Sequence, residues 1–369
     1  MKSEQSSLHG DESIRALSAP LLEVINATPG LTEVSMSEPG VFFLLVDGRW
    51  DRLVLPSMDR TRCLRLVEAV SYYVRQEIKE ESPLLSTALP TGERIQVVIP
   101  PACDPDQLIL QIRVPDRYQG RTLASYADAG VFERFRWVES PNIHRLGDHL
   151  DPPEKALIQH LRNRDLQAFL RDAVLHKKTI AVIGDTGSGK TTLMKALCGI
   201  IPTTEHLVTI EDTRELLLPN HPNKKHLLYA KGGAAAKRVS PSDLIASCMR
   251  LRPDRVLLAE LRGAEAWDFL KLMTAGHAGS ITSFHAESCA LAFERWAFMA
   301  KEHPDAVSAS AQDIKTLVNL TVDVIIHMTA KTIYDLDGEA TGVDRYVTEV
   351  HFDPAARLAY AVGEGVLHA

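Results

Sequence analysis

The residues whose types and spacing most clearly indicate a chemical function form the stretch GDTGSGKT, which runs from Gly184 to Thr191. This stretch matches the phosphate-binding pattern G-x-x-x-x-G-K-[ST] at every fixed position. Its glycines allow main-chain N–H groups to point at phosphate oxygens, because no side chain blocks the approach. The lysine can reach the β- and γ-phosphates of a nucleotide, and the hydroxyl after it can ligate Mg²⁺. We therefore predict that ATP and Mg²⁺ bind at a loop made of Gly184, Asp185, Thr186, Gly187, Ser188, Gly189, Lys190, Thr191 and Thr192.

The elements that must position this loop are visible on either side of it. Residues 180–183 form a short apolar run, which is typical of a buried parallel strand. Residues 192–197 have a helical pattern, and Gly199 and Pro202 would end that helix. The order strand, glycine loop, helix also places the positive end of a helix dipole at the phosphates.

Two acidic residues follow later apolar runs. Glu211 comes after the run 207–210, and Glu260 comes after 256–259. Carboxylates at the carboxyl ends of parallel strands face the ligand crevice, where they can hold Mg²⁺ through water or orient the attacking water. The alternative for Glu211 is a solvated strand end, and for Glu260 it is an ion pair with a neighbour such as Arg262.

Two histidines, His277 and His285, flank another short apolar run. A zinc site is disfavoured because no third ligand of suitable type and spacing lies nearby. His285 at a strand end could instead donate a hydrogen bond to the γ-phosphate, whereas a buried ring with satisfied hydrogen bonds is the alternative.

Composition restricts the class of protein. A chain of 369 residues with 45% apolar residues suggests two globular domains. The net charge of −7 provides no overall positive field, so strong direct binding of nucleic acid is not expected. The five cysteines form no C-x-x-C pair, which fits core thiols in a reducing compartment. Neither a secretory signal nor a long apolar span is evident, so we expect a cytoplasmic protein with peripheral membrane contact still possible.

The pattern along the chain predicts an α+β N-terminal domain followed by an α/β domain with a mainly parallel sheet. We expect a disordered N-terminus over residues 1–10, the first domain over 11–138, a proline-containing linker over 139–154 and the second domain over 155–369. The helices expected are 13–27, with Pro20 as an interruption, 58–79 and 157–175; the strands expected, besides those named above, are 41–46, 50–55, 94–99, 108–114, 280–283 and 322–328.

Together, the phosphate loop, the acidic stretch at Glu211, the strand ending in Glu260 and the histidine stretch resemble the type II/IV secretion ATPase superfamily. The phrases LPTGERIQ at 89–96 and QIRVP at 111–115 are similar to the conjugation-type branch, the traffic ATPases of type IV secretion. One departure is Ala259, where the family more often has glycine.

The resemblance implies a RecA-like ATPase domain and a homo-hexameric ring with nucleotide between the two domains of a subunit. It also implies that Arg94 and Arg113 reach the phosphates from the N-terminal domain, although each could instead form a surface ion pair. With Lys190, Glu260, Glu211 and His285, they form the expected catalytic set. The implied function is an ATPase that powers pilus biogenesis or the export of protein or DNA–protein substrates, acting with other secretion components at the cytoplasmic face of the inner membrane.

Three other functions fit part of this pattern. A type II secretion or type IV pilus assembly or retraction ATPase is the main alternative, although the four-cysteine zinc module common in type II members is missing. A nucleotide-gated scaffold without useful turnover would not need Glu260. A DNA-translocating motor is disfavoured by the acidic balance and the lack of a basic arm.

Overall fold

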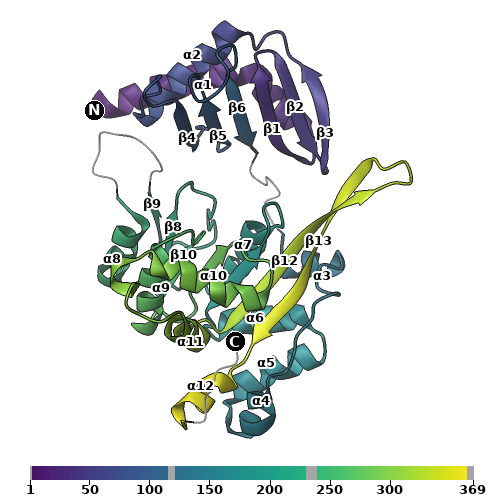
Figure 1. Cartoon of the computed structure of the whole chain (residues 1–369), viewed down its shortest axis with the longest axis vertical. Helices are drawn as coiled ribbons and strands as arrows, with labels where there is room; N and C mark the ends of the chain where they lie inside the picture. The colour runs from purple at the N-terminus through teal and green to yellow at the C-terminus, as the bar shows by residue number, and fades with distance from the viewer. Residues whose placement is uncertain (1, 115–120, 230–238, 364–369) are drawn as a thin grey trace.

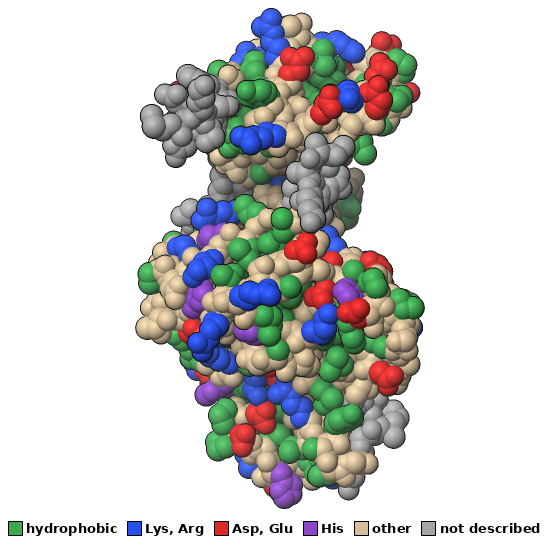
Figure 2. All heavy atoms as spheres, turned by 90° about the vertical axis from the view of Figure 1, so that its left-hand side faces the viewer, with side chains coloured by type: hydrophobic (Ala, Val, Ile, Leu, Met, Phe, Trp, Pro, Cys, Tyr) green, Lys and Arg blue, Asp and Glu red, His purple; other side chains and the backbone are tan. Residues whose placement is uncertain are grey.

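The computed structural model describes residues 2–114, 121–229 and 239–363, with side chains from residue 11 onward. Figure 1 shows two domains, an upper one built on an antiparallel sheet and a larger lower one. Figure 2 shows the same two lobes from the side, with exposed basic and acidic side chains on both. The predicted fold class is confirmed by the two sheets described below.

The N-terminal domain contains a six-stranded antiparallel sheet with the order β3-β2-β1-β6-β5-β4. Helices α1 and α2 lie over one face of it (Figure 1), and alternate strand residues such as Val34, Met36 and Ile112 are buried there. The elements are α1 Lys2–Ala27, β1 Leu31–Glu38, β2 Val41–Val46, β3 Arg49–Val54, α2 Arg60–Val74, β4 Leu84–Ala88, β5 Arg94–Val98 and β6 Ile109–Arg113. The sequence pattern did not predict β1 or β4.

Helix α1 differs from the expectation in two ways. It begins at Lys2, where the sequence predicted a disordered segment over 1–10, and it continues through Pro20. A proline cannot donate to the carbonyl four residues earlier, which here belongs to Ala16. Arg62 of α2 compensates, because its Nη2 donates to the Ala16 carbonyl at 2.7 Å and its Nε to the Leu17 carbonyl at 2.8 Å.

The second domain contains a seven-stranded sheet with the order β13-β12-β7-β11-β10-β8-β9. All neighbouring strands are parallel except β12 and β13, which form a long antiparallel hairpin. The strands are β7 Ile180–Gly184, β8 Leu207–Glu211, β9 Lys224–Leu228, β10 Arg255–Leu258, β11 Ile281–Phe284, β12 Val324–Tyr334 and β13 Ala340–Phe352.

Helices cover both faces of this sheet. Because strand side chains alternate, Ile180 and Val182 enter one core while Ala181 and Ile183 enter the other. The helices are α3 Leu123–Asp128, α4 Pro141–Leu146, α5 Pro152–Arg162, α6 Leu166–Leu175, α7 Lys190–Cys198, α8 Pro241–Leu251, α9 Glu265–Thr274, α10 Cys289–Lys301, α11 Ala311–Thr321 and α12 Ala355–Ala361, with short 3-10 turns at Gly147–His149 and Pro304–Ala306.

The division between the domains lies earlier than expected. Val114 belongs to the core of the first domain, whereas Leu123 and Tyr126 already pack in a core of the second. The predicted linker 139–154 contains α4 and the start of α5, and it is folded onto the second domain. Its prolines begin helices, because proline suits the first helical position as well as a linker.

The single helix predicted over 157–175 is two helices, α5 and α6. Arg164 adopts a positive φ of 58° between them. Its guanidinium donates to the carbonyls of Glu133 at 2.9 Å and Phe135 at 3.0 Å, which holds this turn in place without a glycine.

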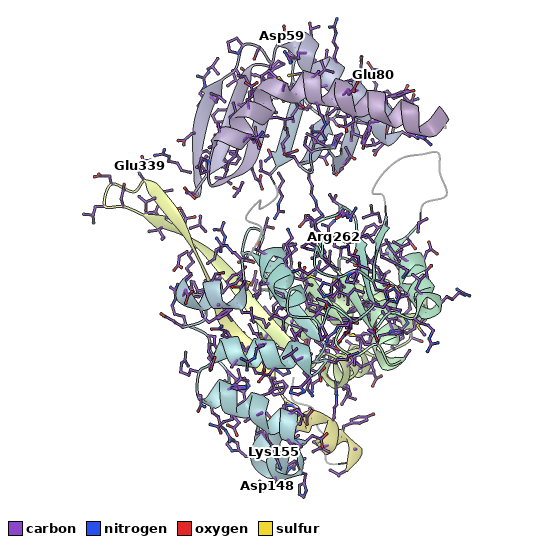
Figure 3. All side chains as sticks on the ribbon, turned by 180° about the vertical axis from the view of Figure 1, so that it is seen from behind. Asp59, Glu80, Asp148, Lys155, Arg262 and Glu339 are labelled. Atoms are coloured by element: carbon purple, nitrogen blue, oxygen red, sulfur yellow. The ribbon has the colours of Figure 1, made fainter. Side chains whose placement is uncertain are left out.

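The hairpin of β12 and β13 leaves the sheet and extends toward the N-terminal domain, with Glu339 near its tip (Figure 3). A Cβ placed on Gly48, in the turn between β2 and β3, would lie 2.7 Å from Cγ2 of Val343. The turn and the hairpin are therefore in close contact. Among the described helices, none is both long and apolar enough to cross a membrane.

Candidate active site

The phosphate loop connects β7 to α7, as the sequence predicted, although α7 begins two residues earlier than expected, at Lys190. Three of its glycines have positive φ: 139° at Gly184, 78° at Gly187 and 94° at Gly189. A Cβ on Gly184 would lie 1.9 Å from the carbonyl oxygen of Met328 in β12. The loop conformation therefore requires glycine both for backbone geometry and for space.

Lys190, the first residue of α7, turns its side chain back over the loop. Its Nζ donates to the carbonyls of Gly184 and Asp185, each at 2.7 Å, and lies 3.3 Å from Nδ1 of His285. Burial lowers the pKa of the Lys190 ammonium to about 8, an effect that Arg113 strengthens and Glu260 opposes. The ammonium is thus held in a partly desolvated position, where a phosphate charge would be a favourable partner.

Glu260 and His285 follow the neighbouring strands β10 and β11, so the carboxyl ends of these strands bring them together. The Nε2 of His285 lies 3.4 Å from the Oε1 of Glu260, and the Nη2 of Arg262 donates to Oε2 at 2.5 Å. Burial, and next the charge of Asp212, raise the pKa of the Glu260 carboxyl. Burial, and next Lys190, lower the pKa of the His285 imidazole, which favours its neutral form.

A second group of charges joins the two domains. Arg94 begins β5 of the N-terminal domain, and its Nη2 lies 2.6 Å from Asp212 and 3.0 Å from Glu215 of the second domain. Arg262 also binds Asp212, with an Nη1–Oδ2 distance of 3.0 Å. Figure 3 places Arg262 at the end of the second domain that faces the first. The acidic stretch after β8 is therefore a docking point for a guanidinium of the first domain.

Arg113 lies beside Arg94, at the last residue of β6. It is the cross-strand partner of Arg94 in the pairing of β6 with β5. Its positive charge adds to the effect of burial, which lowers the pKa of Lys190, and opposes the effect of burial, which raises the pKa of Glu260. Arg94 therefore contacts the acidic stretch directly, whereas Arg113 lies beside Arg94 on the paired strand.

Glu211 has a different environment from the one expected. Its side chain is fully buried, and its Oε1 accepts the N–H groups of Glu215 at 2.9 Å and Leu216 at 3.0 Å. Its Oε2 accepts the Thr209 hydroxyl at 3.1 Å. These bonds orient the loop that carries Asp212, so we assign Glu211 a positioning role instead of contact with metal or water.

His277 also has a local partner, since its Nδ1 lies 3.2 Å from the carbonyl of Pro253. This contact connects two loops at the end of the sheet opposite the phosphate loop, because His277 precedes β11 and His285 follows it. The two histidines therefore have separate environments.

The residues present fit a bound nucleotide. The Ser188 hydroxyl is buried and has no hydrogen-bond partner among the described residues. The buried Nε of Arg94 likewise has none within the part of the chain that the structure describes. Both groups are donors, and the first turn of α7 adds the hydroxyls of Thr191 and Thr192. The donors are suited to phosphate oxygens. The oxygen of a threonine hydroxyl is suited to a metal ion that also binds the phosphate.

Two residues at this site were missed by sequence reasoning. Asp212 is adjacent to Glu211, and the acidic stretch alone could not show which carboxylate faces the first domain. Arg345 of β13 donates from Nε to the carbonyl of Gly187 at 2.9 Å. No local motif marks this arginine, because it follows the loop by more than 150 residues.

Comparison with known proteins gives a consistent result. The family described as "Type II/IV secretion system protein" matches residues 157–344. The type IV secretion system protein VirB11 of Brucella suis is 40% identical over 336 residues, which cover 90% of this chain and 89% of that protein. PtlH of Bordetella pertussis, another type IV secretion system protein, is 36% identical over 299 residues, covering 80% of this chain and 84% of PtlH.

Solved structures extend the comparison to the fold. The crystal structure of the VirB11 ATPase from the Brucella suis type IV secretion system, in complex with sulphate, matches with a TM-score of 0.52 and 39% identity, covering 94% of this chain and 99% of that one. The pilus retraction motor PilT with bound ADP matches with a TM-score of 0.51 at 14% identity, covering 94% of this chain and 86% of PilT, and this likeness concerns the fold alone.

Proposed function

Because the chain belongs to the type II/IV secretion system protein family, we propose that it is the ATP-hydrolysing motor of a type IV secretion system. The relatives that are 36% to 40% identical are named as type IV components, which favours this branch over the type II and pilus motors. The observation that carries the proposal is the assembly of Lys190, Glu260 and His285 at one loop, faced by Arg94 from the other domain.

In this proposal the main-chain N–H groups of Gly187 to Thr192, the Ser188 hydroxyl and the Lys190 ammonium hold the β- and γ-phosphates of ATP. Thr191 supplies the hydroxyl ligand of Mg²⁺. The metal, when bound, neutralises charge on the phosphate oxygens.

Glu260 accepts a proton from the attacking water, or orients that water, with its carboxylate held by Arg262. His285 lies between Lys190 and Glu260, with its Nδ1 at Lys190 and its Nε2 at Glu260, so in this proposal its ring turns from one of these partners to donate a hydrogen bond to the γ-phosphate. Arg94 and Arg113 add positive charge from the first domain, so the charge of the phosphate group affects how the domains sit together.

We further propose that the chain works as a homo-hexamer with other components of the secretion system at the cytoplasmic face of the inner membrane. Closing and opening of the two domains around the nucleotide would then drive pilus biogenesis or substrate export. The similarity to VirB11 and PtlH supports the role in type IV secretion. The ion pairs between the domains support the link between domain position and the nucleotide site.

The test is steady-state release of phosphate from ATP by the wild-type chain, Lys190→Ala and a control variant, Lys195→Ala. Lys195 lies in the last turn of the same helix α7. We expect Lys190→Ala to lower kcat/KM by at least about 100-fold, the scale of a lost electrostatic contact to the transferred phosphate, and Lys195→Ala to leave it near the wild-type value. Equal turnover by the wild type and Lys190→Ala would exclude this site.

Assembly has a separate test. Mass measurement by light scattering, with and without ATP and Mg²⁺, should reveal a closed oligomer of six chains. A monomer at every concentration would contradict the ring while leaving ATP hydrolysis to be judged by the first experiment.

A further inference from the structure

Arg345 makes a contact that the proposed function does not use. Its Nε donates to the carbonyl oxygen of Gly187, the central glycine of the phosphate loop, at 2.9 Å. Its Cδ lies 3.7 Å from the position that a Cβ on Gly189 would occupy. The side chain of Arg345 therefore lies along the loop, and its guanidinium binds the loop's main chain.

This bond acts on a peptide group whose orientation matters for phosphate binding. A trans peptide is planar, so the carbonyl of Gly187 and the N–H of Ser188 point in opposite directions. One of the two dihedral angles that rotate this peptide is the ψ of Gly187, so the peptide turns more freely than one between two residues with side chains. By holding the carbonyl on the β13 side, Arg345 keeps the Ser188 N–H directed to the other side of the loop, where it donates to the Asp185 carbonyl at 3.3 Å, a long bond that a phosphate oxygen would replace.

The strand that carries Arg345 also touches the first domain. Val343 lies two residues before Arg345 on β13, so the two side chains point to the same face of the hairpin, roughly 7 Å apart along the strand. Val343 is the residue in close contact with Gly48 in the turn between β2 and β3. Pairing with Thr332 and Ala330 of β12 makes this part of β13 a continuous ladder.

We propose that Arg345 is a positioning residue for nucleotide binding, and that the β12–β13 hairpin transmits the position of the N-terminal domain to the phosphate loop. When the turn at Gly48 supports Val343, Arg345 holds the Gly187 peptide in the orientation that binds phosphate. When the turn withdraws, this restraint weakens and nucleotide binds less tightly. The proposal rests on the proposed function, because it concerns the same ATP site.

Kinetics of Arg345→Met and Arg345→Lys test the first part. The loop contacts phosphate in the ground state and in the transition state alike, so loss of the restraint should raise KM for ATP about tenfold and change kcat by less than about threefold. Arg345→Lys retains a donor and should recover most of the wild-type KM. A merely structural role would instead lower the melting temperature and the active fraction without this split between KM and kcat.

Arg134→Met is the matched control. Arg134 pairs with Asp344 at 2.6 Å and lies over the Tyr346 ring at 3.6 Å, so its removal takes a cation from the same strand region without touching the loop. KM should stay within about twofold of the wild-type value. If Arg134→Met and Arg345→Met raised KM equally, the effect would come from hairpin charge, and the positioning role of Arg345 would be refuted.

The second part is tested by a double-mutant cycle. Val343→Ala should raise KM about two- to threefold in the wild-type background and have no effect once Arg345 is Met, because the transmitting bond is gone. Additive effects would overturn the transmission. Unchanged KM in every variant, with wild-type turnover intact, would refute the inference alone, whereas absence of turnover in the wild type would refute the proposed function.

Discussion

Replacing Glu260 by Gln separates turnover from nucleotide binding. The carboxylate contacts Arg262 and lies near His285, and among the described residues it makes no bond to the phosphate-loop main chain. Glutamine has the same shape and cannot accept a proton. Arg262 keeps its second partner, Asp212, at 3.0 Å, so the local structure should survive the change.

The expected magnitude follows from the role of a general base. Proton transfer by a positioned carboxylate contributes about 10² to 10⁴ in rate. We therefore expect kcat to fall by about 10³, which corresponds to about 4 kcal/mol in the activation free energy. Because the loop contacts and Lys190 are unchanged, the dissociation constant for ATP should change by less than about threefold.

The assay combines steady-state phosphate release with equilibrium binding of a fluorescent ATP analogue. Glu302→Gln serves as the control, because Glu302 is an exposed carboxylate at the end of α10 and should leave both constants unchanged. A kcat for Glu260→Gln within about threefold of the wild type, less than about 1 kcal/mol, would refute the assignment of Glu260 as base.

Three further predictions concern pH, domain contact and folding. Since the pKa of Lys190 is about 8 in the free enzyme, kcat/KM should decline as the pH rises above about 8, where the ammonium loses its proton. The decline of kcat should occur at higher pH, because bound phosphate favours the ammonium. A value of kcat/KM that stays constant from pH 7 to pH 10 would contradict this prediction. A cycle of Arg94→Met and Asp212→Asn should give a coupling of about 1 kcal/mol in kcat/KM, since the pair is 2.6 Å apart and partly exposed, and a coupling near zero would mean that the contact is not used. Gly184→Ala should lower the free energy of unfolding by about 3 kcal/mol, measured by urea denaturation, because the new Cβ would lie 1.9 Å from the Met328 carbonyl; wild-type stability would show that β7 and β12 move apart there at little cost.

The parts of the site that sequence predicted are those set by local chemistry. The phosphate loop is contiguous, and Glu260 and His285 each end an apolar run that became a buried parallel strand. Once two such strands are neighbours, their carboxyl ends meet at one edge of the sheet, and the side chains beyond them converge on the loop. Strand adjacency was therefore sufficient to place these residues near Lys190.

What the sequence could not predict depends on orientation or on distant pairing. Glu211 and Asp212 are consecutive carboxylates, and only the folded strand end shows that the first points inward and the second toward Arg94. The residue that makes α1 tolerate Pro20, Arg62, lies on another helix. Arg345 reaches the loop because β12 inserts beside β7 and pairs with β13, which is a property of the whole sheet order.

The salt bridge between Arg94 and Asp212 has a thermodynamic consequence for regulation. If ATP binds better when the lobes are in contact through this pair, any protein that docks on the first lobe and displaces it must change the affinity for ATP. Linkage then requires ATP to change the affinity of that docking protein by the same factor. The affinity of the motor for a secretion channel would then depend on whether ATP is bound, and docking on the channel would change the affinity for ATP by the same factor.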